Sequence, residues 1–270
     1  MSKNPNTTFD FAEEAVRIAE EARKENLTLR ILGATAFRIH SPKNLKIHDA
    51  LKRTLSDIDF AGYSKERDDV ERLFTGRLGF ESVRAAVTPG LFVGRCIFID
   101  KSGTRPHVDV FLDKLDFNHV IDFNGRLDLD FPTIPLADLL LEKLQIVHIN
   151  EKDIKDSILL LLEHVVGEGD NETISMERIV KLMAENWGFY YTATMNLKKL
   201  EKFLTKYQTL TEEQRNTVSS RTEQLLQAIE NVPKSLRWKL RARVGTSKIW
   251  YNEVEEVERA EHLRDDNEVE

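Results

Sequence analysis

Cysteine, long apolar runs and signal-like features are scarce in this sequence. A single cysteine, Cys96, occurs among 270 residues, so neither an internal disulfide nor a cysteine-rich zinc site is possible. The longest apolar run, I-L-L-L-L at residues 158–162, ends at Glu163 and is far shorter than the roughly 20 residues that span a membrane. The first residues lack the apolar core of a signal peptide. We therefore expect a cytoplasmic protein with no membrane partner.

Acidic and basic residues are unevenly distributed along the chain. The formal net charge is −7, and such a charge would repel nucleic acid if it were spread evenly. Residues 253–270 are strongly acidic and are expected to form a disordered tail. A basic cluster without any acid precedes them. Its members are Lys234, Arg237, Lys239, Arg241, Arg243 and Lys248.

Hydrophobic periodicity divides the chain into a mixed αβ part and a helical part. An amphipathic helix is predicted over residues 9–25, capped by Thr8 or Asp10. Further helices are predicted at 34–40 and 65–78, and strands at 27–32, 56–61, 82–87, 96–99 and 107–111. Beyond Pro135 the pattern predicts helices at 136–149 and 153–166, and from Ser175 onward only helices and loops. The expected fold is an α/β (α+β) core with a mixed sheet, followed by an all-helical C-terminal domain.

The predicted domain boundaries follow this change of pattern. Residues 1–135 form the core, and residues 136–168 form a helical segment that completes the active-site side. Gly167 to Asp170 is read as a junction, and residues 171–252 form the helical C-terminal domain.

Two carboxylates stand two residues apart in the predicted strand 56–61. Alternation along a strand places Asp57 and Asp59 on the same face, while Ile58 points into the core. Adjacent carboxylates repel each other unless a cation lies between them, and Mg²⁺ usually binds through one or two carboxylates plus substrate phosphates. The pair is therefore a candidate Mg²⁺ or Mn²⁺ site. A solvated strand edge with alternating acids is the other interpretation.

Two further features favour the metal interpretation. Asp109 lies in the apolar strand 107–111, and it would complete a three-carboxylate cluster if that strand pairs beside the first; His107 would share its face. Gly33 follows a predicted strand and opens a helix, a place where phosphate oxygens can approach the backbone, and Thr35 adds a hydroxyl donor. An ordinary turn is the alternative for Gly33 alone.

The order of these features resembles a known family. G-A-T-A-F at residues 33–37, R-T-L-S-D-I-D at 53–59 and H-V-D-V at 107–110 are similar to the motifs of DNA polymerase β-like nucleotidyltransferases, and most similar to those of AbiEii-type toxins. The resemblance covers roughly residues 28–165. Ala34 departs from it, because the family usually has a second glycine there, and its methyl group would crowd a phosphate.

The resemblance implies a function and further site residues. It implies a Mg²⁺-dependent nucleotidyltransferase in which Asp57, Asp59 and Asp109 are catalytic, and in which a toxin would have an antitoxin partner. By position it assigns a phosphate contact to Lys143 and a bracing role to Lys152 and Asp153; a solvated helix face with ion pairs is the alternative. The remaining candidate nucleotide contacts are Gly33, Ala34, Thr35, Ser56 and Arg53, although Arg53 could equally pair with an exposed acid.

Basic residues alternate with other residues between 235 and 243 and include an aromatic. Bases and aromatics together suit nucleic-acid backbone contact and base stacking, so an RNA or tRNA acceptor is one hypothesis. A solvated helix face, or pairing with the acidic tail, is equally open. The candidate contacts are Arg237, Trp238, Lys239, Arg241 and Arg243. For the whole protein, the alternative to an enzyme is a catalytically inactive nucleotide- or partner-binding protein with the same fold.

Overall fold

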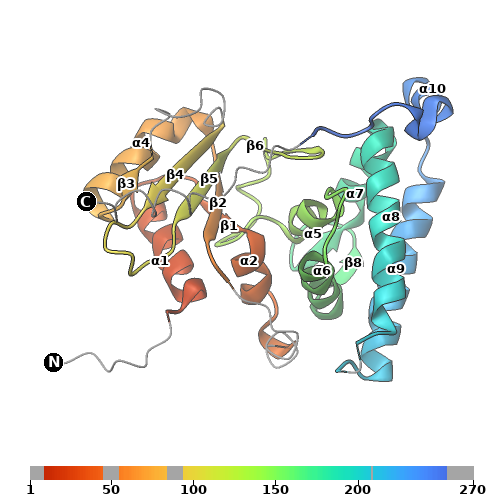
Figure 1. Cartoon of the computed structure of the whole chain (residues 1–270), viewed down its shortest axis with the longest axis horizontal. Coiled ribbons are helices and arrows are strands. Elements are labelled where there is room, and N and C mark those ends of the chain that lie inside the picture. The colour runs from red at the N-terminus through yellow and green to blue at the C-terminus, as the bar shows by residue number, and fades with distance from the viewer. Residues whose placement is uncertain (1–8, 45–54, 84–93, 208, 254–270) are drawn as a thin grey trace, which may run out of the picture.

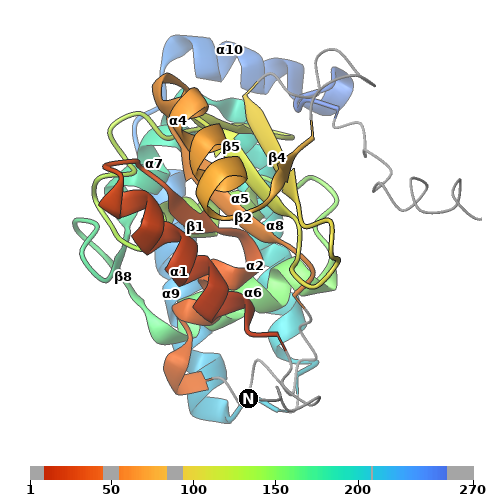
Figure 2. The ribbon, with the colours of Figure 1, turned by 90° about the vertical axis from the view of Figure 1, so that its left-hand side faces the viewer.

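A computed structural model of the chain describes residues 9–44, 55–83, 94–207 and 209–253. A five-stranded sheet with its covering helices forms one side of the molecule in Figure 1, and a group of helices forms the other. Figure 2, turned by 90°, places α1 (Phe11–Lys24) in front of the sheet. The mixed α/β fold class predicted from the sequence is therefore confirmed. No helix within the described ranges is both long and apolar enough to span a membrane.

The sheet mixes parallel and antiparallel pairs in the order β1-β2-β5-β4-β3. The β2–β5 pair is parallel, and the β1–β2, β4–β5 and β3–β4 pairs are antiparallel. The outer edge of β1 is covered where Ile31 bonds with Pro132 and Ile134. The five strands are β1 (Arg30–Leu32), β2 (Ile58–Gly62), β3 (Glu81–Ser82), β4 (Arg95–Ile99) and β5 (Val108–Leu112).

The two faces of the sheet differ in chemistry. Ile58 and Phe60 of β2 are fully buried, and Phe60 packs edge-on against Phe74. Phe74 in turn stacks on Phe98 of β4 with ring centroids 4.1 Å apart. Because side chains alternate along a strand, Asp59 lies on the opposite face. One face of the sheet therefore builds the aromatic core, and the other carries Asp59 and Asp109 beside buried apolar residues such as Leu32 and Phe111.

Three helices, α1, α2 and α4, precede the helical half of the described chain. Asp10 caps α1 by accepting backbone N–H bonds from Ala12 and Glu13, as predicted, whereas Thr8 lies outside the described residues. The helix α2 (Gly33–Ile39) follows β1 directly and packs against α1, α5 and α6. The segment predicted as one helix at 65–78 consists of a 3-10 turn, α4 (Arg67–Arg72) and a π-helical turn at Leu73–Arg77.

The helix α5 lies between the sheet-bearing half and the remaining helices. All nine of its residues are buried, and it packs against α2, α6, α7 and α8. The helices of this half are α5 (Leu136–Leu144), α6 (Glu151–Glu163), α7 (Met176–Glu185), α8 (Trp187–Leu204), α9 (Glu212–Asn231) and α10 (Leu236–Val244).

Several predicted boundaries are wrong. The helix predicted at 136–149 ends at Leu144, and α6 starts after Asn150, whose side chain accepts N–H bonds from the first turn. The strand predicted at 82–87 is only partly described, because residues 84–93 lie outside the described part. Of its residues, Ser82 lies in β3. Two small sheets were not predicted: β6 (Lys114–Asp116) with β7 (Val120–Asp122), and β8 (Val165–Gly167) with β9 (Thr173–Ser175).

Candidate active site

Asp59 and Asp109 are direct neighbours across the only parallel pair among the described strands of the main sheet. In the β2–β5 register Asp59 pairs with Asp109, and in the β1–β2 register Leu32 pairs with Asp59. The β1 strand ends at Leu32, and the next residue, Gly33, lies beside Asp59. The sheet register thus brings together two of the predicted carboxylates and the predicted glycine turn.

Asp109 is held by basic residues from the same side of the sheet. Its side chain is only 4% exposed, and Arg95 Nη2 donates to its Oδ2 at 2.5 Å. His107 Nε2 lies 3.8 Å from Asp109 Oδ2 and 3.8 Å from Asp57 Oδ2. His107 therefore bridges two of the predicted carboxylates, as its shared face with Asp109 suggested. Within the described residues, Asp109 Oδ1 is buried without a hydrogen-bond partner.

The electrostatics of this face disfavour an ionised Asp59. Burial is the largest cause that raises the pKa of Asp59 well above its ordinary value of 3.8, and Asp57, Asp109 and Glu142 raise it further. Lys143 acts in the opposite direction and lowers it. A bound cation would relieve this repulsion, because opposite charge at short range favours the ionised carboxylate.

The glycine turn is shaped by Asp59. Gly33 has φ +68°, and a Cβ atom placed on it would collide with Asp59 Oδ2. A side chain is therefore excluded both by backbone conformation and by space. The Gly33 N–H donates to Glu142 Oε2 at 3.0 Å. Thr35 is 1% exposed, and its Oγ1 has no hydrogen-bond partner within the described residues. Ala34 is partly exposed.

Lys143 lies inside a cluster of acids. Its Nζ is 2.9 Å from Glu142 Oε1, 3.5 Å from Asp156 Oδ2 and 3.6 Å from Asp153 Oδ1. Burial alone would lower the pKa of Lys143, but the three carboxylates together raise it above its ordinary value. The lysine is therefore positively charged, and Asp153 is one of the carboxylates that contact it. Lys152 is exposed on the first turn of α6.

The carboxylates meet the chemical needs of a divalent cation only in part. Among the described residues, no three histidine, cysteine or acidic side chains are placed so that they could hold a metal ion together. Asp109 is engaged by Arg95, which leaves Asp57 and Asp59 as the oxygen donors. Two carboxylates with substrate phosphates are a common donor set for Mg²⁺. The residues therefore fit one such ion more readily than a three-carboxylate centre.

The structure adds residues that sequence reasoning missed and leaves others untested. Arg95 and Glu142 were not predicted, and the only signal for Glu142 was its position beside Lys143. Asp156, the third acid on Lys143, was not among the predicted site residues and is fully buried. Arg53 lies outside the described residues, and Ser56 is exposed immediately before Asp57.

The predicted basic patch is partly committed to holding α10 in place. Trp238 Nε1 donates to the Met183 carbonyl at 2.9 Å, and Arg241 donates to the carbonyls of Gly245, Lys248 and Ile249. These two side chains therefore have structural partners. Arg237, Lys239 and Arg243 are exposed. An apolar stripe accompanies them on the same helix and its next turn, formed by the exposed residues Leu236, Leu240, Val244 and Ile249.

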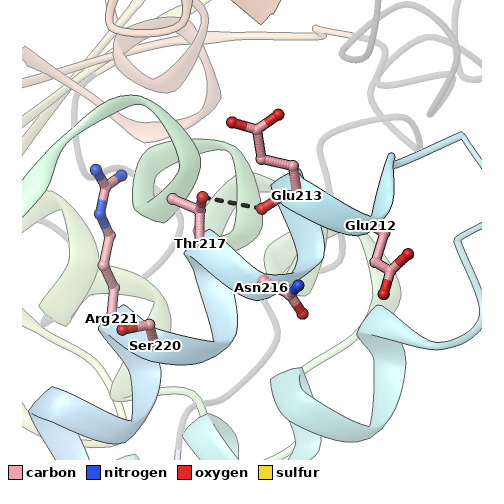
Figure 3. A pocket seen from close by; sticks show the side chains of 6 residues that line it. All are labelled: Glu212, Glu213, Asn216, Thr217, Ser220 and Arg221. Carbon is pink, nitrogen blue, oxygen red and sulfur yellow. Dashed lines mark hydrogen bonds between the residues drawn. The ribbon is translucent and has the colours of Figure 1, made fainter.

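A surface hollow on α9 is unrelated to the carboxylate face. It is lined by residues of this one helix (Figure 3), and Thr217 Oγ1 donates to the Glu213 carbonyl within it. None of the predicted site residues contributes. The lining residues are Glu212, Glu213, Asn216, Thr217, Ser220 and Arg221.

Comparison with known proteins gives one distant structural likeness. No family model matches the chain, and no curated protein matches it. A solved structure, an antigenic nucleotidyltransferase-like protein from Paracoccidioides brasiliensis, is similar over 83% of this chain and 94% of its own, with 15% identity and a TM-score of 0.40. A TM-score of 0.40 marks a loose correspondence, and the function proposed for this chain rests on its own residues.

Proposed function

We propose that this chain is a magnesium-dependent nucleotidyltransferase, which moves a nucleoside monophosphate from a nucleoside triphosphate to a hydroxyl group of RNA or protein. The observation that carries the proposal is the sheet register that sets Asp59 beside Asp109, with the Gly33 turn directly against Asp59. Few structural roles need a buried carboxylate beside a half-buried one, because the arrangement raises the pKa of Asp59 and costs stability unless a cation is bound.

Asp57 and Asp59 are the residues assigned to hold the ion. The ion would supply neutralisation of the triphosphate charge. Gly33 and Thr35 are assigned to the phosphates, with Thr35 Oγ1 as an uncommitted donor. Lys143 would add positive charge behind this turn, because it contacts Glu142, which accepts the Gly33 N–H. The residues would act chiefly by positioning and charge neutralisation.

Asp109 is assigned to the acceptor hydroxyl. The hydroxyl oxygen attacks the α-phosphorus, the bond from that phosphorus to the bridging oxygen breaks, and pyrophosphate leaves with the electron pair. The hydroxyl proton passes to Asp109, whose Oδ1 has no hydrogen-bond partner within the described residues. A carboxylate oxygen with an unused lone pair is a suitable general base.

The direct test is label transfer. Purified protein is incubated with each α-labelled nucleoside triphosphate, Mg²⁺ and total cellular RNA, beside an Asp57→Ala, Asp59→Ala double variant. The matched control is an Asp68→Ala, Asp69→Ala variant, which removes two neighbouring aspartates from the exposed first turn of α4. We expect label on RNA or protein with the wild type and the control only. Equal labelling by the double variant at the site would overturn the proposal.

The proposed contact with an RNA acceptor involves only the exposed basic side chains of α10. Arg237, Lys239 and Arg243 are available for phosphate contact, whereas Trp238 has an internal partner. We expect a triple Arg237→Gln, Lys239→Gln, Arg243→Gln variant to bind RNA more weakly and with a smaller dependence on salt. Unchanged affinity and unchanged salt dependence would remove RNA binding from this helix.

A toxin role belongs to the same proposal through the family resemblance. It is tested by expressing the wild type and the Asp57→Ala, Asp59→Ala variant at equal levels and following growth. Arrest by the wild type alone would support a toxin that needs its transferase site and an antitoxin partner. Equal growth would remove this role and leave the transferase proposal intact.

One observation favours an inactive nucleotide-binding protein as the second candidate. Asp109 is already paired with Arg95, and the Gly33 N–H is already bonded to Glu142, so both groups have internal partners. Pyrophosphate release separates the candidates: nucleotide binding without release, in the presence of total RNA and protein, supports the inactive binder.

A further inference from the structure

We propose that Arg95 pairs with Asp109 and so keeps a metal ion away from this carboxylate. The carboxylate face then binds one divalent cation tightly, through Asp57 and Asp59, and a second one only weakly. This inference rests on the proposed metal site. It assigns Arg95 a positioning role, in which a guanidinium from β4 takes the place that a second ion would otherwise take beside Asp109.

The geometry of the Arg95–Asp109 pair supports this assignment. Register pairs Arg95 with Phe111, which is two residues beyond Asp109 on β5, so Arg95 and Asp109 lie on the same face of the sheet. The guanidinium carbon lies 5.0 Å from the centroid of the Phe111 ring, and Nη2 reaches Asp109 Oδ2 at 2.5 Å. The arginine is therefore held over the site by the sheet itself.

The same carboxylate oxygen has a second basic neighbour. His107 Nε2 is 3.8 Å from Asp109 Oδ2. A divalent cation at Asp109 Oδ2 would have to displace the guanidinium of Arg95, whose permanent positive charge repels it. His107 Nε2 lies equally close to Asp57 Oδ2, at 3.8 Å, so Arg95 alone distinguishes Asp109 from the other carboxylates.

The pair leaves one oxygen of Asp109 uncommitted. Oδ1 is buried without a partner within the described residues, and so is Arg95 Nε. A bidentate pair would have used both oxygens. The single contact instead fixes the orientation of the carboxylate through Oδ2 alone. Arg95 thus occupies the oxygen of Asp109 that a second ion would need.

The test counts bound Mn²⁺ on the full chain by electron paramagnetic resonance of the free ion. It compares the wild type with Arg95→Gln, which removes the charge, and Arg95→Lys, which keeps it. The matched control is Arg105→Gln. Arg105 pairs with Asp100 in the connection between β4 and β5, and its side chain is 24% exposed, against 26% for Arg95. Circular dichroism checks that each variant is folded.

We expect one tight Mn²⁺ in the wild type, in Arg95→Lys and in Arg105→Gln, and a second ion in Arg95→Gln bound at least about tenfold more tightly than in the wild type. Two tight ions in the wild type, or an unchanged second site in Arg95→Gln, would overturn the inference and leave the proposed transferase standing. The Asp57→Ala, Asp59→Ala variant separates the two proposals: if it keeps the tight ion, the metal assignment of the proposed function fails as well.

Discussion

Two charged clusters flank the buried helix α5, and they differ in how their charges are balanced. Near the first turn, Asp138 is fully buried and accepts bonds from Arg126 at 2.8 Å and Arg178 at 2.9 Å. Arg126 also donates twice to Asp170, and Arg178 to the Asp122 carbonyl. Two arginines thus face two aspartates, and each guanidinium has several acceptors.

The cluster at the other end of α5 has an excess of carboxylates. Glu142 contacts Lys143 and the Gly33 amide, and beyond that turn the acidic face raises the pKa of Asp59. Asp109 Oδ1 and Thr35 Oγ1 lack hydrogen-bond partners within the described residues. Buried polar groups are normally satisfied, so the two clusters differ in how completely their polar groups are paired.

The largest effect is expected for Asp59→Asn. On the proposed function it should lower label transfer on the order of 10³-fold or more, because a metal ligand is lost. The free energy of unfolding at pH 7 should not fall. A carboxyl whose folded-state pKa is raised stabilises the fold only at low pH, and this contribution is lost as the pH rises through that pKa. Transfer assays and urea unfolding at pH 7 measure the two effects. A large fall in the free energy of unfolding would contradict the expectation that Asp59 serves activity rather than stability.

Asp138→Asn should give the opposite result. It leaves Arg126 and Arg178 without their shared carboxylate, and breaking a buried pair costs about 3–5 kcal/mol. Urea unfolding measures the loss. Asp170→Asn is the control, because Asp170 is 20% exposed and contacts only one of the two arginines, so its effect should be smaller. Equal and small effects would show that this cluster is not structural.

Gly33→Ala tests the close approach at the site. The new methyl would collide with Asp59 Oδ2 in a left-handed backbone conformation, so we expect a loss of about 1–3 kcal/mol. Gly103→Ala separates the two causes, because Gly103 has φ +66° with nothing within 4 Å of an added Cβ. The control should lose only the conformational part. Equal losses in urea unfolding would mean that the contact with Asp59 costs nothing.

The smallest effect concerns a buried histidine that packs against α8. His119 stacks on Phe189 and bonds to Thr192, and burial lowers its pKa from 6.5 to about 4. A lowered pKa means that its neutral form stabilises the fold above pH 6.5, and that this contribution is lost as the pH falls toward 4. His119→Gln should reduce the acid-induced loss by about 1–2 kcal/mol. Unfolding at pH 7 and pH 4.5 checks it; an unchanged loss would contradict it.

Much of the fold followed from local patterns in the sequence. The strands containing Ile58 and Val108 were recognised because apolar residues alternate with acids there, and that alternation also put Asp57 and Asp59 on one face. The helix after Asp10 was recognised from its period and its cap. The short sheets β6–β7 and β8–β9 were missed because strands of three residues carry too little periodicity to detect.

The sequence by itself determined which chemistry the site can offer, because alternation and the strand-to-helix glycine depend only on neighbouring residues. Tertiary structure decided how those groups are paired. Strand register set Asp59 beside Asp109 and brought Arg95 over it, and helix packing delivered Glu142 to the Gly33 amide across 109 positions in the chain. Such pairings join residues far apart in sequence, and their energies depend on burial and distance, which no local pattern contains.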